Sequence, residues 1–259
     1  MNQRHEPQRP DESRPAAEAS LARARVLIAG VGGLGAPAAW ALAAAGVGTL
    51  ILVDPDVVEV SNLHRQILHR TSSVGIAKVE SARQRIARRW PRVHVETVRE
   101  RVRHDSAAAL FAGTDFIVDG TDDAETKYVI NDVAVRAGVA YSHAGAAGLL
   151  GQTLTVVPGR SACLRCVFPQ PPAATETARC RDEGILGPVA GAIGFVQAAE
   201  ALRYLLGREL ACEGRLLTFD ARALRWRAVP LTRDAGCPSC RVHPSLTPSP
   251  ERAAVSHGS

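Results

Sequence analysis

The sequence predicts an α/β fold with a doubly wound, mainly parallel sheet that is extended by antiparallel strands. Three observations carry this prediction. Short apolar strands alternate with helical segments over the first 150 residues, a glycine-rich turn joins the first strand to the first helix, and the pattern after residue 148 alternates as antiparallel strands do. With 259 residues and 46% hydrophobic side chains, the chain can bury one sizeable core.

The expected elements follow from apolar runs and their stop signals. Glycines end the first and last helices of the alternating part, and Pro91 closes the amphipathic helix between them. The expected strands there are 24–30, 49–54, 93–98, 115–120 and 139–145, and the expected helices are 33–46, 77–90, 105–113 and 124–138. Beyond them we expect a strand over 148–159, a long apolar helix over 187–207 and a hairpin over 214–231.

The chain ends differ in composition from the centre. We expect a disordered, polar and Pro-rich arm over residues 1–21, one nucleotide-binding domain over 22–242 and a disordered, low-complexity tail over 243–259. The arm lacks the apolar segment of a secretory signal, and apolar runs elsewhere are too interrupted to span a membrane, so we expect a cytoplasmic protein.

The charge balance favours small anionic ligands or an acidic partner protein. The net charge is +5, but aromatic residues make up only 4% and no basic block stands out, which argues against nucleic acid. Of the 31 basic residues, only Lys78 and Lys127 are lysines. An arginine-rich codon bias explains this, unless a retained lysine is needed as a compact point charge.

A glycine-rich turn indicates a Rossmann-like nucleotide site. Gly30, Gly32 and Gly35 form G-x-G-x-x-G between a strand and a helix, where backbone N–H groups can face a phosphate. Gly33 belongs to the same turn, although helix packing also explains it. Asp54 ends the second strand, 19 residues after Gly35, where a carboxylate accepts hydrogen bonds from ribose. The turn does not distinguish NAD from ATP.

The segment after Asp54 favours ATP. Asn62, Arg65 and Gln66 follow the ribose acid, and Lys78 lies 13 residues beyond Arg65. A triphosphate needs such cations, whereas hydride transfer does not. The alternative is a solvated helix with ordinary surface charges.

Three carboxylates follow the fourth expected strand. Asp119, Asp122 and Asp123 lie at the edge of the sheet that faces the ligand crevice in open α/β folds. They could hold Mg²⁺ against phosphate oxygens. Helix capping by Asp122 or Asp123 is the alternative.

The cysteines separate into two C-x-x-C pairs and two single residues. Two pairs can supply four thiolates to a closed, structural Zn²⁺ site, which we prefer to disulfides. Cys180 lies between two arginines, which would lower its pKa and make it reactive, unless it is an inert loop residue. Cys212 has no such context. The paired residues are Cys163, Cys166, Cys237 and Cys240.

Several motifs together resemble the ThiF/MoeB/HesA adenylyltransferases, which are relatives of the ubiquitin-activating enzymes. The resemblance covers residues 22–240, and its closing segment is most similar to ThiF. The matching stretches are GVGGLGAPAAWALAAAGVGTLILVDPDVVEVSNLHRQIL, GIAKVESA, DGTDDAETKYVIND, CLRC, GILGPVAGAIGFVQAAEAL and CPSC.

The resemblance implies an activity and its partners. The family binds Mg-ATP and adenylates the C-terminal Gly-Gly carboxylate of a small ubiquitin-like sulfur carrier, which then receives sulfur in thiamine- or molybdopterin-type pathways. It implies a homodimer and a sulfur donor such as a cysteine desulfurase.

The resemblance also implies roles for individual residues. Asp54 would bind ribose, Asn62, Arg65 and Lys78 would contact the nucleotide and its phosphates, and Asp122 would be linked to Mg²⁺. Cys180 would form a covalent link with the carrier during sulfur transfer. Lys127 lies where relatives often carry Arg, which favours an ordinary role for it.

Two departures from the family pattern leave other functions open. The N-terminal Arg-Tyr-x-Arg-Gln stretch is absent, and Asp123 replaces an Asn, which adds a negative charge near ATP. A pseudoenzyme that binds nucleotide and carrier is therefore one alternative. An NAD-dependent oxidoreductase is another, since the glycine turn does not distinguish NAD from ATP.

Overall fold

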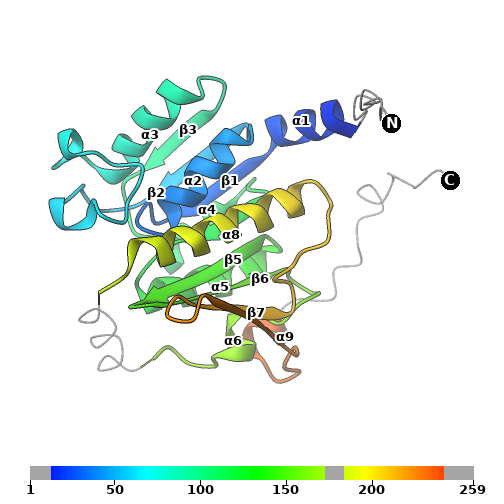
Figure 1. The fold of residues 1–259 in the computed structure, drawn as a ribbon. Helices are drawn as coiled ribbons and strands as arrows, with labels where there is room; N and C mark the ends of the chain where they lie inside the picture. The colour runs from blue at the N-terminus through cyan, green and yellow to red at the C-terminus, as the bar shows by residue number, and fades with distance from the viewer. Residues whose placement is uncertain (1–12, 173–183, 242–259) are drawn as a thin grey trace, which may run out of the picture.

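The computed structural model describes residues 13–172 and 184–241 (Figure 1). Within them, one sheet has the strand order β3-β2-β1-β4-β5-β6-β7-β8. The strands are β1 (Arg25–Ala29), β2 (Thr49–Val53), β3 (His94–Val98), β4 (Phe116–Asp119), β5 (Ala140–Ala147), β6 (Leu150–Val156), β7 (Arg215–Asp220) and β8 (Arg225–Pro230). The helices are α1 (Ser13–Arg23), α2 (Gly35–Ala44), α3 (Lys78–Arg89), α4 (His104–Phe111), α5 (Ala124–Ala137), α6 (Leu164–Val167), α8 (Gly187–Leu205) and α9 (Pro238–Arg241), with short 3-10 helices η1 (Val60–Asn62) and η2 (Thr71–Ser73).

The sheet confirms the predicted change from parallel to antiparallel strands. Strands β3, β2, β1, β4 and β5 pair in parallel, and these are the strands that alternate with helices along the chain. Strands β6, β7 and β8 extend the same sheet by antiparallel pairing. Parallel strands need helical crossovers, whereas antiparallel strands can follow each other through short turns.

Two layers of helices cover the parallel strands. Val26 and Ile28 of β1 pack into the core that includes residues of α2, α3 and α8. The intervening Leu27 and Ala29 pack into the core that includes residues of α4 and α5. Figure 1 shows α2 and α8 lying side by side over the sheet. Because side chains alternate between the faces of a strand, apolar runs such as RVLIA are buried on both faces.

The strand order places a crevice between β1 and β4. These two strands are neighbours, but their following helices lie on opposite faces of the sheet. Such a switch point opens a crevice at the carboxyl ends of the strands. Gly30 follows β1, Asp54 follows β2 and Asp119 ends β4, so all three reach this edge.

Residues 13–21 of the expected N-terminal arm are helical where we expected disorder. Helix α1 begins at Ser13, within the stretch expected to be disordered through residue 21. Leu21 is buried in the core, and the hydroxyl of Ser20 donates to the carbonyl of Leu205 in α8 at 3.4 Å, which explains the order. Residues 1–12 and the expected tail over 243–259 lie outside the described residues. None of the helices in the described ranges is long and apolar enough to cross a bilayer.

Two glycines of α8 provide a test of its packing against α2. A Cβ on Gly194 would lie 2.2 Å from the carbonyl oxygen of Leu34, whereas a Cβ on Gly191 meets nothing within 4 Å. We expect Gly194→Ala to lower the free energy of unfolding by about 1–3 kcal/mol. Gly191→Ala should raise it by about 0.5–1 kcal/mol, because alanine favours the helix. Urea unfolding of both variants measures this, and equal effects would contradict the packing.

Candidate functional site

The glycine turn brings three backbone segments into direct contact. Gly30 has φ +82°, and a Cβ on it would lie 2.8 Å from the carbonyl oxygen of Gly120. A Cβ on Gly35 would lie 1.8 Å from the carbonyl oxygen of Gly30. Neither position accepts a side chain, so the turn stays tight and the N-terminus of α2 remains close to the crevice.

The other two glycines of the turn have different surroundings. A Cβ on Gly32 would meet only the side-chain amide of Gln66, at 3.5 Å. A Cβ on Gly33 would lie 3.2 Å from Cβ of Ala190 in α8 and against the side chain of Arg65. Gly33 is therefore a packing position between α8 and the cationic segment, as well as part of the turn.

Asp54 is a buried acceptor at the end of β2. Its carboxylate accepts hydrogen bonds from the N–H of Val31 at 2.7 Å and of Asp56 at 2.9 Å. Burial raises the pKa of Asp54, and the ammonium of Lys78, 3.9 Å away, opposes that change. Lys78 also pairs with Asp56 at 2.7 Å. The lysine is therefore held by two carboxylates at the end of β2.

The residues after β2 differ in whether they line a cavity. Arg65 and Gln66 line the large cavity at the carboxyl ends of the parallel strands, whereas Asn62 lies outside its lining. Asn62 accepts a hydrogen bond from the guanidinium of Arg65 at 2.5 Å and so orients it. Gln66 is buried, and its Oε1 has no hydrogen-bond partner among the described residues. An unpaired buried amide oxygen is costly to the folded state.

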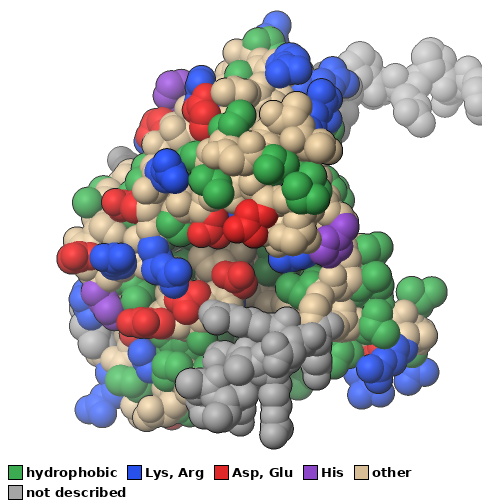
Figure 2. Space-filling model, turned by 90° about the vertical axis from the view of Figure 1, so that its left-hand side faces the viewer, with side chains coloured by type: hydrophobic (Ala, Val, Ile, Leu, Met, Phe, Trp, Pro, Cys, Tyr) green, Lys and Arg blue, Asp and Glu red, His purple; other side chains and the backbone are tan. Residues whose placement is uncertain are grey.

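These groups share a cavity of about 1700 Å³ at the carboxyl ends of the parallel strands. Figure 2 shows the hollow, with acidic and basic side chains around it. Pockets for small molecules usually enclose about 300–1,000 Å³, so this cavity has room for a nucleotide and part of a second substrate. Its lining includes most of the predicted nucleotide residues: Gly30, Gly32, Gly33, Asp54, Arg65, Gln66, Lys78, Asp122 and Asp123.

Asp122 and Asp123 face the cavity but differ in their contacts. Asp122 is exposed, and no hydrogen bond or ion pair joins it to the described residues. Asp123 caps α5: its carboxylate accepts from the N–H and hydroxyl of Thr126 and pairs with Arg101 at 3.2 Å. Burial alone would raise the pKa of Asp123, but Thr126 and Arg101 outweigh it and lower the pKa. The charge expected to oppose ATP is thus already compensated.

Asp119 is not available to a metal ion, which corrects its inclusion among the expected Mg²⁺ carboxylates. It is fully buried, and it bonds Lys127 at 3.1 Å, His143 at 3.0 Å and the hydroxyl of Thr121 at 2.7 Å. Burial alone would raise its pKa, but Lys127 and His143 lower it to about 2. The ammonium of Lys127 also donates a hydrogen bond to the carbonyl of Ala144.

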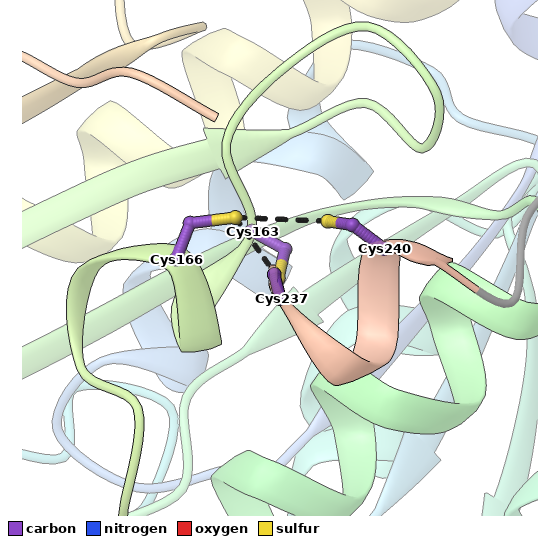
Figure 3. A group of neighbouring side chains, drawn as sticks. All are labelled: Cys163, Cys166, Cys237 and Cys240. Atoms are coloured by element: carbon purple, nitrogen blue, oxygen red, sulfur yellow. Dashed lines mark hydrogen bonds between the residues drawn. The ribbon is translucent and has the colours of Figure 1, made fainter. Parts of the chain in front are cut away.

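The four paired cysteines meet in one cluster (Figure 3). Their sulfur atoms all lie within 4.8 Å of one another. Three of the sulfur pairs are 3.8, 3.7 and 3.6 Å apart. A regular tetrahedron with Zn–S bonds of about 2.3 Å has sulfur atoms about 3.8 Å apart, so the cluster already has nearly the dimensions of a zinc site. Cys163 and Cys166 come from the start of α6, and Cys237 and Cys240 from the region of α9.

The remaining two cysteines differ in what can be described. Cys180 lies outside the described residues. Cys212 is buried, and burial together with nearby Glu200 raises the pKa of its thiol to about 12. It is therefore a core residue with little thiolate at neutral pH.

Comparisons with known proteins point to one family. A sequence profile of the ThiF family matches residues 8–239. The chain is 41% identical over 230 residues to the SAMP-activating enzyme E1 of Haloferax volcanii, covering 89% of this chain and 85% of that protein. It is 41% identical over 229 residues to the adenylyltransferase and sulfurtransferase MOCS3 of Culex quinquefasciatus, covering 88% of this chain and 52% of that protein. The chain thus spans about half the length of this second relative.

A solved structure supports the fold. The crystal structure of Escherichia coli MccB with ATP aligns with a TM-score of 0.77 at 22% identity, covering 86% of this chain and 68% of that chain. At this identity the likeness extends to the fold alone.

The N-cap of α5 predicts different effects on stability for two neighbouring carboxylates, Asp123 and Asp122. Asp123→Ala should lower the free energy of unfolding by about 1 kcal/mol at pH 7, because the helix loses its N-cap. The folded-state pKa of Asp123 lies below its usual value, so the contribution exists above about pH 4 and fades as the pH falls further. Asp122→Ala, which removes no cap, should change stability by less than about 0.5 kcal/mol. Urea unfolding across this pH range tests both, and equal losses would contradict the assignment.

Proposed function

The chain belongs to the ThiF family, and we propose that it uses ATP to adenylate the C-terminal Gly-Gly carboxylate of a small ubiquitin-like sulfur-carrier protein. The observation that carries this proposal is the shared cavity, which combines a glycine turn, a ribose-type acid and two cations. The named relatives are an activating enzyme and an adenylyltransferase, which fits this chemistry.

The residues around the turn suit ATP better than a dinucleotide. The N-terminus of α2 would take phosphate oxygens, Asp54 the ribose hydroxyls, and the unpaired amide of Gln66 a further ligand donor. Arg65 and Lys78 would contact the triphosphate, with Asn62 orienting Arg65. Asp122 offers an exposed carboxylate at the cavity, which fits a Mg²⁺ ion bound mainly through phosphates and water.

The proposed step joins two anions. A carboxylate oxygen of the carrier attacks the α-phosphorus of ATP, and pyrophosphate leaves. Arg65 and Lys78 would stabilise the charge that develops on the phosphates, and Mg²⁺, when bound, would neutralise part of it. The attacking carboxylate is already ionised near pH 7, so this step needs no general base.

The cavity extends past the proposed nucleotide residues. There it is lined by Leu150 of β6, Phe219 of β7 and Arg227 of β8. We infer that the carrier's Gly-Gly tail enters there, because this part of the cavity is left free by the proposed nucleotide site.

We further propose the partners that the family pattern implies. The protein would act as a cytoplasmic homodimer, with sulfur from a donor such as a cysteine desulfurase. Cys180 would link covalently to the carrier during sulfur transfer, and its two flanking arginines support a reactive thiolate.

The cysteine cluster is proposed to hold a structural Zn²⁺ ion. The four thiols have the spacing of a tetrahedral set, and a site with four protein ligands leaves no open position for catalysis. The ion would tie the region of α9 to α6, which lies beside α5.

The phosphate assignment predicts a loss of exchange. Arg65→Ala and Lys78→Ala should each reduce carrier-dependent ATP–pyrophosphate exchange about a hundredfold or more, because each removes charge from the transition state. Arg83→Ala is the matched control. Arg83 shares α3 with Lys78 but, among the described residues, its ion pair is with Glu80, and it lies outside the cavity. Near wild-type exchange in both cavity variants would refute the phosphate site, and NAD binding without exchange would favour an oxidoreductase.

The metal assignment predicts about one zinc ion per chain. Cys237→Ser should lose the zinc and lower the thermal unfolding temperature, because metal binding contributes directly to folding. Cys212→Ser should keep the zinc, since Cys212 is buried away from the cluster. Metal analysis of protein purified without chelator measures both, and zinc-free wild-type protein would contradict the proposal.

A further inference from the structure

A histidine in the cavity is not used by the proposed adenylation step. His143 of β5 lies opposite Asp119 of β4 in the parallel register, and its Nδ1 is 3.0 Å from the carboxylate. An ionised carboxylate only accepts hydrogen bonds, so Nδ1 carries the proton. In the neutral ring, Nε2 then has a free lone pair.

The ring lies in the wall of the cavity that substrate would enter. Nε2 has no hydrogen-bond partner among the described residues, and the imidazole lines the same cavity as Asp54, Lys78 and Asp122. The ring itself is only 5% exposed, so its orientation is fixed by packing. Thr153 of the neighbouring strand donates to the carbonyl of His143 and holds the backbone in place as well.

Two charged groups set the protonation state of the ring. Burial and the ammonium of Lys127 lower the pKa of His143, while Asp119 opposes them, and the pKa stays below its usual value. From α8, the packed side chain is the neutral Gln197, which bonds Ser142. His143 is therefore neutral near pH 7 and can accept a proton.

The chemistry after adenylation does need a proton acceptor. A neutral thiol that attacks the acyl adenylate must lose its proton as the carbon–sulfur bond forms. Oriented histidine bases assist such transfers by about a hundredfold or more. A buried carboxylate beside a histidine also stabilises the imidazolium that forms when the ring accepts a proton.

We propose that His143 is the general base that activates a thiol for attack on the carrier acyl adenylate within this cavity. The thiol proton moves to Nε2, the sulfur bonds to the acyl carbon, and the bond from that carbon to the AMP oxygen breaks. AMP leaves with the electron pair, and the imidazolium later returns its proton to water. No oxidation or reduction occurs. This inference rests on the proposed function.

Asp119 is a positioning residue in this step. It fixes the ring through Nδ1 and stabilises the imidazolium, while the ion pair with Lys127 keeps its own charge buried and satisfied. The ammonium of Lys127 bonds both Asp119 oxygens and the carbonyl of Ala144, so it has no donor left for phosphate.

The test separates proton removal from all other roles of the ring. Acyl adenylate is preformed from ATP and a Gly-Gly carrier with pyrophosphatase present, and thioester formation is followed in a single turnover near pH 7. One probe is 2-mercaptoethanol, which is mostly protonated, and the other is 2-nitro-5-thiobenzoate, which is already ionised. His143→Gln should slow the first reaction about a hundredfold and change the second less than about threefold. His104→Gln, which alters an exposed histidine outside the cavity, should affect neither.

Other outcomes would overturn the inference. If His143→Gln slows both thiols equally, the ring has a structural role, and if it slows neither, it is not a base. Wild-type protein supplies a second measurement that does not depend on a variant folding. Its rate with 2-mercaptoethanol should level off above a pKa that lies below the usual value of histidine, because burial lowers it. A rate that keeps rising with thiol ionisation contradicts a base. If wild-type protein forms no adenylate with any Gly-Gly carrier, the proposed function itself has failed.

Discussion

Backbone contact among three glycines is the constraint on which the site depends. Gly30, Gly35 and Gly120 approach so closely that a Cβ on any of them would lie within 2.8 Å of another glycine's backbone. The contact joins the end of β1, the start of α2 and the end of β4. It places the N-terminus of α2 at the crevice, where its N–H groups can face an anion. Asp54 and the acidic loop after β4 lie around this point because β2 and β4 flank β1.

The charged side chains around this contact form two groups. The outer group is Lys78 with Asp54 and Asp56, and the inner group is Lys127 with Asp119 and His143. Lys78 in the outer group is held by buried Asp54 and by exposed Asp56. Lys127 in the inner group is committed to buried Asp119, which in turn orients His143. Breaking a buried pair leaves an uncompensated charge, at a cost of about 3–5 kcal/mol. Both lysines of the chain line the cavity, but Lys78 pairs with two carboxylates after β2, whereas Lys127 pairs with a fully buried one.

Features encoded by local spacing could be predicted from the sequence. The glycines of the turn and the cysteines of each C-x-x-C pair lie within a few residues of one another, and the structure brings each group together. Features that depend on register or distant packing could not. Asp119 was expected to serve Mg²⁺, but the pairing of β4 with β5 sets it against His143. Asp123 meets Arg101 only through the fold, and Asn62 supports Arg65 from outside the cavity. Leu21 was expected to belong to a polar, Pro-rich arm, but its contacts with the core bury it.

The central claim is that a carrier carboxylate attacks the α-phosphorus of ATP in this cavity. Labelling both carboxylate oxygens of the carrier with the heavy isotope of oxygen tests it directly. After reaction with ATP, hydroxylamine releases the acyl group, and mass spectrometry weighs the AMP. Attack at the α-phosphorus predicts one heavy oxygen in AMP, because the oxygen that formed the bond to phosphorus stays with it. Unlabelled AMP, or label found in ADP or inorganic phosphate, would contradict the claim.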